Sequence, residues 1–384
     1  MDFLMTDQQR LIIETIRRFV QDEIVPLEAH LDPDAFELPE EEFDRLVGMV
    51  KEMGFWNLSV PTEFGGPGLD LVTLTLAAEE MSQHRAGLYA PCYHVFGHGG
   101  LAQLYEANED QRQRYLLPLI RGEKHAFFAL TEPSGGSDPA RAIRTTAVRD
   151  GDHWVLNGTK VFISGADQAD FGLVFARSDP AQGRAGITCF IVDSDTPGFR
   201  VRRIIHVLRS TEYPCEIEFD ECRVPECNVL GEVNKGFTIA NDRLTRNRIP
   251  YAAGSIGVAV AAQRMAIRWA KQRETFGDLL AHRQAIQWMI VDNEIDLRTS
   301  RWLTLEAASK ADCGEPFRFE TAMAKVVATE AAGRVVDRAI QVHGGLGVTK
   351  DLPLERWYRE LRIRRIGEGP SEVQRIIMAR DLLY

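Results

Sequence analysis

The chain has 384 residues, of which 45% are hydrophobic and 26% charged, an ordinary balance for a globular protein of two or three domains. Its net charge of −11 argues against nucleic-acid binding, which needs a basic surface, but not against an anionic small ligand held by local arginines. No apolar run is long enough to span a bilayer, so we expect no membrane insertion. The polar N-terminus is unlike a signal or transit peptide, which favours a cytoplasmic protein of bacterial type.

The six cysteines argue against a metal site. Three of them fall within residues 215–227, but neither CxxC spacing nor a neighbouring histidine accompanies them. We therefore expect reduced thiols and no bound metal.

Residues 1–124 are predicted to be helical. Thr6 and Gln9 have capping-box spacing ahead of an apolar helix face. Pro39 followed by three glutamates predicts a second helix start, and that helix is expected to stop at Gly54. These elements form a predicted N-terminal helical domain.

The periodicity changes near His125. Short apolar runs separated by turn residues then predict strands, which are 127–130, 154–156, 161–163, 171–176, 187–192, 201–205 and 215–219. Asp150-Gly151 and Asn157-Gly158 are dipeptides typical of hairpin turns. Seven or so strands without intervening helices predict a compact β-barrel or sandwich over residues 125–235, not alternating βαβ units.

Residues 236–384 are predicted to be helical again. The segment 252–270 is rich in alanine and contains Gly254 and Gly257, which allow neighbouring helices to approach closely. Long amphipathic helices are expected over 283–311 and 319–342. The fold class is therefore α+β multidomain, with a helical domain at 1–124, a β-domain at 125–235 and a four-helix-type bundle at 236–384.

Two stretches of the β-domain have residues suited to a flat, polar ligand. In Phe128–Asp138 a strand ends at Thr131 and a Gly/Ser loop follows, whose N–H groups and hydroxyls suit a ring edge or a phosphate. In Trp154–Ser164 an aromatic residue, Phe162, stands two residues before a hydroxyl on the same strand face. The plainer alternatives are a surface loop and ordinary core packing.

Two stretches of the last domain invite a similar interpretation. Arg273–Gly277 sets an arginine near a phenylalanine, which suits a pyrophosphate or adenine, although a solvated helix end is the alternative. Gln341–Gly347 is rich in glycine but follows a helix instead of a strand, so a Rossmann fingerprint is rejected. His343 within it has no carboxylate partner evident in the sequence, which favours a structural histidine over a base.

The stretch Arg364–Glu372 sets one carboxylate, Glu368, between two glycines on irregular backbone. Alone it would be a solvated turn glutamate. The α–β–α order together with TEPSGGSD, GTKVFIS, RETFG, QVHGGLG and GEGPSE resembles the acyl-CoA dehydrogenase family over nearly the whole chain. The combination is specific, although each motif alone is not.

The resemblance implies FAD as cofactor, bound between the middle β-domain and the C-terminal helices. Flavin contacts are implied for Phe128, Leu130, Thr131, Phe162, Ser164 and Pro370, the last of which stands where many members have threonine. Contacts to the FAD of a neighbouring subunit are implied for Arg273, Phe276, Gln341 and Gly345. The cross-subunit contacts imply a homodimer or homotetramer.

Glu368 matches the family's usual catalytic base, which removes the α-proton of an acyl-CoA thioester while the β-hydrogen leaves as hydride to the flavin. Substrate contacts are implied for Ser137, Arg248, Gly367 and Gly369. Because straight-chain members often carry tyrosine at the position of Gly367, its absence suggests an open pocket and a branched, cyclic or bulky acyl group. Electrons would pass to an electron-transfer flavoprotein.

Three alternatives to this function remain. An enoyl-CoA reductase would run the same chemistry backwards in the same site. A flavin oxidase or monooxygenase that reacts with oxygen shares the fold but typically lacks the glutamate at 368. A non-enzymatic helical scaffold would not need these motifs together.

Overall fold

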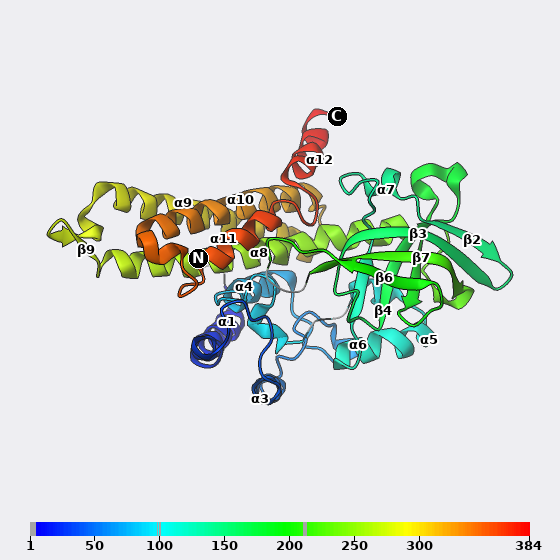
Figure 1. Cartoon of the computed structure of the whole chain (residues 1–384), viewed down its shortest axis with the longest axis horizontal. Coiled ribbons are helices and arrows are strands. Elements are labelled where there is room, and N and C mark those ends of the chain that lie inside the picture. Colours follow the sequence, from blue (N-terminus) through cyan, green and yellow to red (C-terminus); the bar gives the residue numbers. More distant parts are fainter. Residues whose placement is uncertain (1–4, 98, 100, 210–212) are drawn as a thin grey trace. The chain divides into compact units, whose positions relative to one another are not determined.

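The computed structural model describes residues 5–97, 99, 101–209 and 213–384. The helical, then β-rich, then helical order confirms the predicted fold class (Figure 1). By packing, the chain forms two compact units, which we call the helical unit (Met1–Leu58, Pro67–Phe96 and Thr245–Tyr384) and the β unit (Ser59–Gly66 and Gly97–Leu244). The domain boundaries at 124/125 and 235/236 stay predictions, because the packing units are not defined by contiguous sequence.

The N-terminal helices of the helical unit begin where the sequence predicts. Helix α1 (Asp7–Phe19) is capped by Thr6, whose side chain and that of Gln9 make the reciprocal capping-box bonds. Helix α3 (Glu40–Glu52) follows Pro39 and ends just before Gly54, which adopts φ of 72°. Helix α4 (Leu71–Met81) and the short α2 (Val25–Leu27) complete this part.

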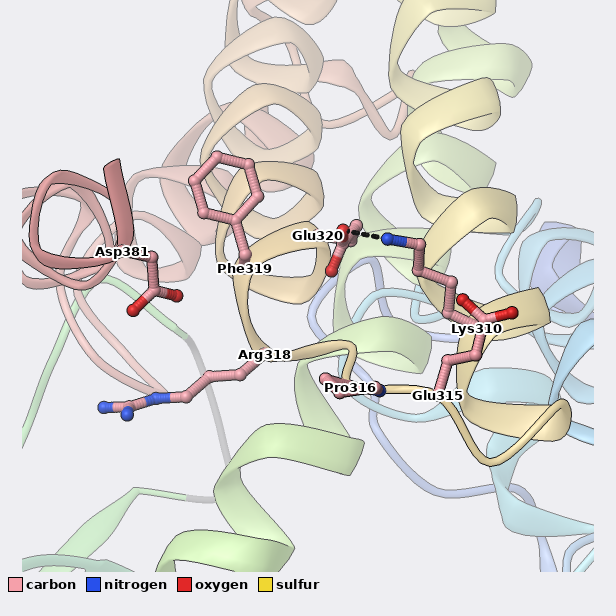
Figure 2. A pocket seen from close by; sticks show the side chains of 7 residues that line it. All are labelled: Lys310, Glu315, Pro316, Arg318, Phe319, Glu320 and Asp381. Carbon is pink, nitrogen blue, oxygen red and sulfur yellow. Dashed lines mark hydrogen bonds and ion pairs between the residues drawn. The ribbon is translucent and has the colours of Figure 1, made fainter. Parts of the chain in front are cut away.

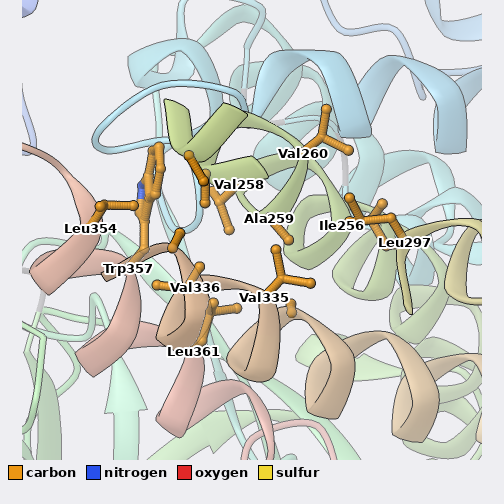
Figure 3. Packing of buried hydrophobic residues seen from close by; sticks show 14 of the residues in the cluster. Ile256, Val258, Ala259, Val260, Leu297, Val335, Val336, Leu354, Trp357 and Leu361 are labelled. Atoms are coloured by element: carbon orange, nitrogen blue, oxygen red, sulfur yellow. The ribbon is translucent and has the colours of Figure 1, made fainter. Parts of the chain in front are cut away.

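Long helices make up the rest of the helical unit. They are α8 (Gly236–Ala270, from residue 245 onwards), α9 (Gln284–Asp312), α10 (Arg318–His343), α11 (Leu354–Arg364) and α12 (Ser371–Leu383). The buried faces of α8, α9, α10 and α11 meet in one apolar cluster that includes Ile256, Leu297, Val335 and Trp357 (Figure 3). A Cβ at Gly257 would collide with the carbonyl of Glu79, which confirms the close helix approach expected at that glycine.

Among the described residues, the strands of the β unit form an eight-stranded sheet of order β6-β7-β3-β2-β4-β5-β8, with β1 paired to β4. The strands are β1 (Ala126–Ala129), β2 (Thr146–Asp150), β3 (His153–Ser164), β4 (Phe171–Arg177), β5 (Ile187–Asp193), β6 (Phe199–Ile204), β7 (Pro214–Pro225) and β8 (Val229–Leu230). Short helices α5 (Glu109–Gln111), α6 (Leu117–Arg121) and α7 (Pro139–Ala142) flank them. Alternate residues of β4 pack in different cores, Leu173 in one and Val174 in the other, so this strand is buried on both faces of the sheet.

One turn prediction is confirmed and one is wrong. Asp150-Gly151 lies at the β2–β3 turn, where Asp150 and His153 pair. Asn157-Gly158, however, lies inside the twelve-residue strand β3, at a register shift against β7. The Asn157 side chain accepts from the backbone N–H of Glu221 and donates to its carboxylate across this bulge. The asparagine therefore stabilises an irregular strand instead of a hairpin turn.

Candidate active site

The residues predicted for the site fall into two groups, one in each unit. Phe128, Leu130, Thr131, Ser137, Phe162 and Ser164 belong to the β unit. Arg248, Arg273, Phe276, Gln341, Gly345, Gly367, Glu368, Gly369 and Pro370 belong to the helical unit. The two groups are described separately, and within the helical unit the residues around Glu368 are distinct from those around Phe276.

In the β unit, a buried ion pair joins the two stretches that were predicted to line a flat ligand. The ammonium of Lys160 is fully buried and donates to Glu132 Oε1 at 2.8 Å, to the Leu130 carbonyl at 3.3 Å and to the Phe175 carbonyl at 2.6 Å. The backbone N–H of Val161 donates to the Thr131 carbonyl at 2.9 Å. The strand that carries Phe162 is thus fixed against the loop that follows β1.

Glu132 is satisfied on both carboxylate oxygens. The backbone N–H groups of Arg144 and Thr145 donate to it at 2.6 and 3.0 Å. Burial acts to raise the pKa of Glu132, but the charge and hydrogen bonds of Lys160, with those from Thr145 and Arg144, hold it below its ordinary value. Burial lowers the pKa of Lys160 to about 8 in spite of Glu132. The sequence analysis missed this pair, although a lysine within a strand of buried residues is a signal that could have found it.

The predicted ring-binding side chains of the β unit differ in exposure. Phe162 is 59% exposed and has φ of 60°, a left-handed conformation that is unusual for an aromatic residue, beside a bulge in the β3–β7 ladder. Phe128 is half-buried, with its ring 4.9 Å from that of Phe175. Leu130 is buried and Ser137 exposed. An exposed aromatic ring on strained backbone therefore stands in the hairpin where the sequence predicted a ring-binding face.

In the helical unit, Glu368 lies on the loop between α11 and α12 and has φ of 55°, followed by Gly369 at 90°. Three side chains hold the carbonyls of these two residues. Arg248 Nε donates to the Glu368 carbonyl at 2.8 Å, and Lys325 Nζ donates to the Gly369 carbonyl at 2.9 Å. Gln374 Nε2 reaches the Gly369 carbonyl at 3.1 Å. The loop backbone is therefore fixed from α8, α10 and α12 at once.

The Glu368 side chain has an unused acceptor. Among the described residues, its buried Oε2 has no hydrogen-bond partner. A buried carboxylate oxygen without a donor is costly, and it needs an explanation such as a water, a bound ligand or a catalytic role.

Two of the surrounding cations are perturbed. Burial lowers the pKa of Lys325 to about 8, and Arg248 adds to the effect, while Glu368 opposes it. Burial likewise lowers the pKa of Arg248, which was predicted to face the CoA. Lys325 and Gln374 were missed by the sequence analysis, because nothing in a helical periodicity shows that they reach this loop.

The space beside Gly367 is occupied. A Cβ added there would lie 2.7 Å from the hydroxyl of Tyr251 on α8. The guanidinium of Arg364 contacts two aromatic rings, 3.9 Å from the centroid of Tyr251 and 4.5 Å from that of Tyr89. The pocket inferred from the missing side chain at position 367 is therefore at least partly filled from another helix.

The remaining predicted residues are exposed at the far end of the helical unit. Strands β9 (Glu274–Thr275) and β10 (Asp278–Leu279) form a two-residue hairpin whose tip, Phe276, is fully exposed with φ of 51° (Figure 1). Arg273, Gln341 and Gly345 are exposed too. His343 is buried, bonds the Ala339 carbonyl at 2.7 Å and stacks on Trp269, which supports its structural interpretation.

Three findings concern other kinds of site. A hollow of about 360 Å³ in the helical unit is lined by Lys310, Glu315, Pro316, Arg318, Phe319, Glu320 and Asp381, none of them a predicted site residue (Figure 2). Its lysine is paired with Glu320. In the described part of the chain, no cluster of potential metal ligands occurs, and no helix has the length and apolar character needed to cross a membrane.

Comparison with known proteins identifies the class of enzyme. The family models for the N-terminal, middle and C-terminal domains of acyl-CoA dehydrogenases match residues 6–123, 127–222 and 234–383. The chain belongs to the acyl-CoA dehydrogenase family, whose members are FAD-dependent oxidoreductases.

Three relatives illustrate how similar this chain is to known members of the family. The chain is 40% identical to a 3-(aryl)acrylate reductase of Clostridium sporogenes, over 98% of this chain and 99% of the relative. The solved butyryl-CoA dehydrogenase of Megasphaera elsdenii is 33% identical with a TM-score of 0.88, over 100% of both chains. A solved chain from work on the electron transferring flavoprotein of Acidaminococcus fermentans is 36% identical with a TM-score of 0.88, again over 100% of both.

The residues present fit FAD. An exposed phenylalanine on strained backbone offers a ring face, and the hydroxyls of Thr131 and Ser164 offer polar partners in the same unit. Arg273 and Phe276 offer a cation and a second exposed ring, which suit a pyrophosphate and an adenine. Pro370 has no hydroxyl to contribute.

Proposed function

We propose that the protein catalyses α,β-dehydrogenation of an acyl-CoA thioester, with Glu368 as the base that takes the α-proton. The observation that carries this proposal is the buried Glu368 Oε2, which has no partner among the described residues and stands on a loop fixed by Arg248, Lys325 and Gln374. A base needs a free lone pair in a defined place, and the unpartnered oxygen on a fixed loop backbone supports this role.

The chain's own residues have separate parts in this reaction. Bound FAD supplies the acceptor for the hydride that leaves the β-carbon. The Glu368 carboxylate takes the α-proton. Its backbone N–H donates to no described acceptor, so it is available to the thioester oxygen as negative charge develops there. Phe128, Leu130, Thr131, Phe162 and Ser164 would hold the ring, while Ser137, Gly367 and Gly369 would border the substrate.

The relatives support proposals for the acyl group and the electron partner. The name 3-(aryl)acrylate reductase favours a bulky, aryl-bearing acyl group for this chain too. The solved relative from work on an electron transferring flavoprotein favours such a flavoprotein as the redox partner. The reductase name also favours a second candidate function, the reduction of an enoyl thioester, in which Glu368 would return the proton to the α-carbon.

We propose that the protein acts as a homodimer or homotetramer. Arg273 and Phe276, with Gln341 and Gly345, are exposed as the cross-subunit role requires. Helix α9 also presents exposed large side chains at helical spacing, Trp288, Val291 and Ile295, which suit a subunit contact.

The test is the visible spectrum of the purified protein during anaerobic addition of saturated acyl-CoAs, followed by enoyl-CoAs with the prereduced protein. We expect at least one acyl-CoA to bleach the flavin. Glu368→Gln should keep the flavin but lose turnover by several orders of magnitude, because an amide cannot accept the proton. Glu372→Gln, an exposed glutamate on α12, is the matched control and should keep turnover. Near-normal turnover of Glu368→Gln would refute the base, and a protein that takes up no FAD would refute the function.

A further inference from the structure

Position 367 and Tyr251 share one small volume beside Glu368. A Cβ at Gly367 would be 2.7 Å from Tyr251 Oη, closer than side-chain carbons come to other atoms. The same Cβ would lie 3.8 Å from Tyr251 Cζ and 3.7 Å from the Ile363 carbonyl, both ordinary contact distances. The hydroxyl oxygen alone therefore excludes a side chain at position 367. Backbone strain does not, because Gly367 has no left-handed φ.

Tyr251 is held where it is. Its ring faces the Arg364 guanidinium, which also contacts the ring of Tyr89. Arg364 is itself anchored, since it donates to the Leu88 carbonyl. Burial raises the pKa of Tyr251, and Tyr89, which is hydrogen-bonded to it, acts in the same direction, so the phenol stays protonated at neutral pH. A ring packed in this way cannot swing aside to make room at low cost.

We infer that Tyr251, and not the absent side chain at position 367, is the specificity-determining residue of the acyl site. The inference rests on the proposed function, since Glu368, the residue after Gly367, marks where the α-carbon must lie. Tyr251 on helix α8 then bounds the acyl pocket on the side where straight-chain relatives are expected to carry a tyrosine at the position of Gly367. Removing its ring should enlarge the site, whereas adding atoms at 367 should be tolerated only when the hydroxyl is gone.

A double-mutant cycle with single-atom changes tests the shared volume without any substrate. Gly367→Ala should lower the melting temperature of the FAD-loaded protein by roughly 2–10 °C, as overpacking does. In the Tyr251→Phe background the same alanine should cost clearly less, because only the ordinary contacts at 3.7 and 3.8 Å remain. Equal shifts in both backgrounds would show that the hydroxyl does not limit position 367 and would overturn the inference.

Turnover of a matched pair of substrates tests the specificity itself. Tyr251→Val should raise the ratio of kcat/KM for 3-phenylpropanoyl-CoA over that for butyryl-CoA by about tenfold or more, since it removes bulk beside the base. Tyr358→Val, which changes an exposed tyrosine of α11, is the control and should leave the ratio unchanged. A ratio within twofold of wild type for Tyr251→Val would overturn the inference.

The two failures are distinguishable. If Glu368→Gln is as active as wild type, the proposed base is wrong whatever position 251 does. If the wild-type protein acts on neither acyl-CoAs nor enoyl-CoAs, both the proposed function and the proposed role of Tyr251 in specificity are wrong. The melting cycle still decides, independently of turnover, whether Tyr251 and position 367 compete for the same space.

Discussion

Replacing Lys160 by methionine should strongly destabilise the β unit. Methionine keeps most of the side-chain volume but removes the charge and three hydrogen bonds, to Glu132 and to the carbonyls of Leu130 and Phe175. The Glu132 side chain, only 4% exposed, would be left as a buried carboxylate without its cation. Loss of one partner from a buried ion pair costs about 3–5 kcal/mol in the free energy of unfolding.

The assay is thermal denaturation of the FAD-loaded protein, with flavin release followed in the same samples. At about 2–4 °C per kcal/mol for a unit of 150–250 residues, the melting temperature should fall by roughly 6–20 °C. Flavin should be lost more readily, because Lys160 joins the strand of Phe162 to the stretch that carries Thr131. The double variant Lys160→Met with Glu132→Gln should be more stable than Lys160→Met alone, since no charge is left buried.

The β unit offers a matched control of the same chemistry on the surface. Lys235 pairs with Glu232 at 2.7 Å, nearly the distance of the buried pair, but both side chains are mostly exposed. Lys235→Met should therefore change stability by less than about 1 kcal/mol. If Lys160→Met proved as mild as Lys235→Met, the argument that this buried pair holds the ligand-binding stretches together would be refuted.

Two further predictions concern the helical unit. The pKa of Lys325 is about 8 in the folded protein against an ordinary 10.5, so the contribution of this residue to stability is lost as pH falls through about 8. The melting temperature should therefore rise with pH between about pH 8 and 10. Lys325→Met should flatten this part of the curve of melting temperature against pH, and an unchanged slope would contradict the reasoning. Arg273→Ala should weaken flavin retention and subunit association together, as measured by absorbance and sedimentation. Lys271→Ala serves as its control, and an unaltered flavin-loaded oligomer would count against the cross-subunit contact.

Long periodic elements were predictable from the sequence, and short irregular ones were not. The helices expected over 283–311 and 319–342 are found at Gln284–Asp312 and Arg318–His343, because an amphipathic pattern sustained over several turns leaves little freedom. Asn157-Gly158 misled because the same residues serve a hairpin turn and a strand bulge. Only the pairing of β3 with β7, set by contacts more than fifty residues away, decides between them.

In the candidate site, too, local sequence motifs were predictable and contacts between distant residues were not. Glu368 could be found because its neighbours form a local motif that the family shares. The side chains that hold its loop could not be found in this way. Arg248 lies 120 residues from the Glu368 carbonyl in sequence, and Lys325 lies 44 residues from the Gly369 carbonyl. The open pocket inferred from Gly367 stays a prediction, and the approach of Tyr251 to that position could not be read from the sequence, because a missing side chain does not show what lies beside it in the fold.

Backbone conformation and side-chain exposure bear on the site independently of family resemblance. Phe162, Phe276 and Glu368 were predicted as site residues from motifs, and each adopts a left-handed φ, between 51 and 60°. Such a conformation costs a non-glycine residue on the order of 1–3 kcal/mol and persists only where the surroundings impose it. The two phenylalanines are exposed as well, so their own unit gains little from burying them. For Phe276 the hairpin turn itself requires this φ, and for Phe162 the strand bulge accompanies it, so local structure accounts for both conformations. What remains is that large aromatic side chains stand exposed at these two positions, where the motifs place the flavin.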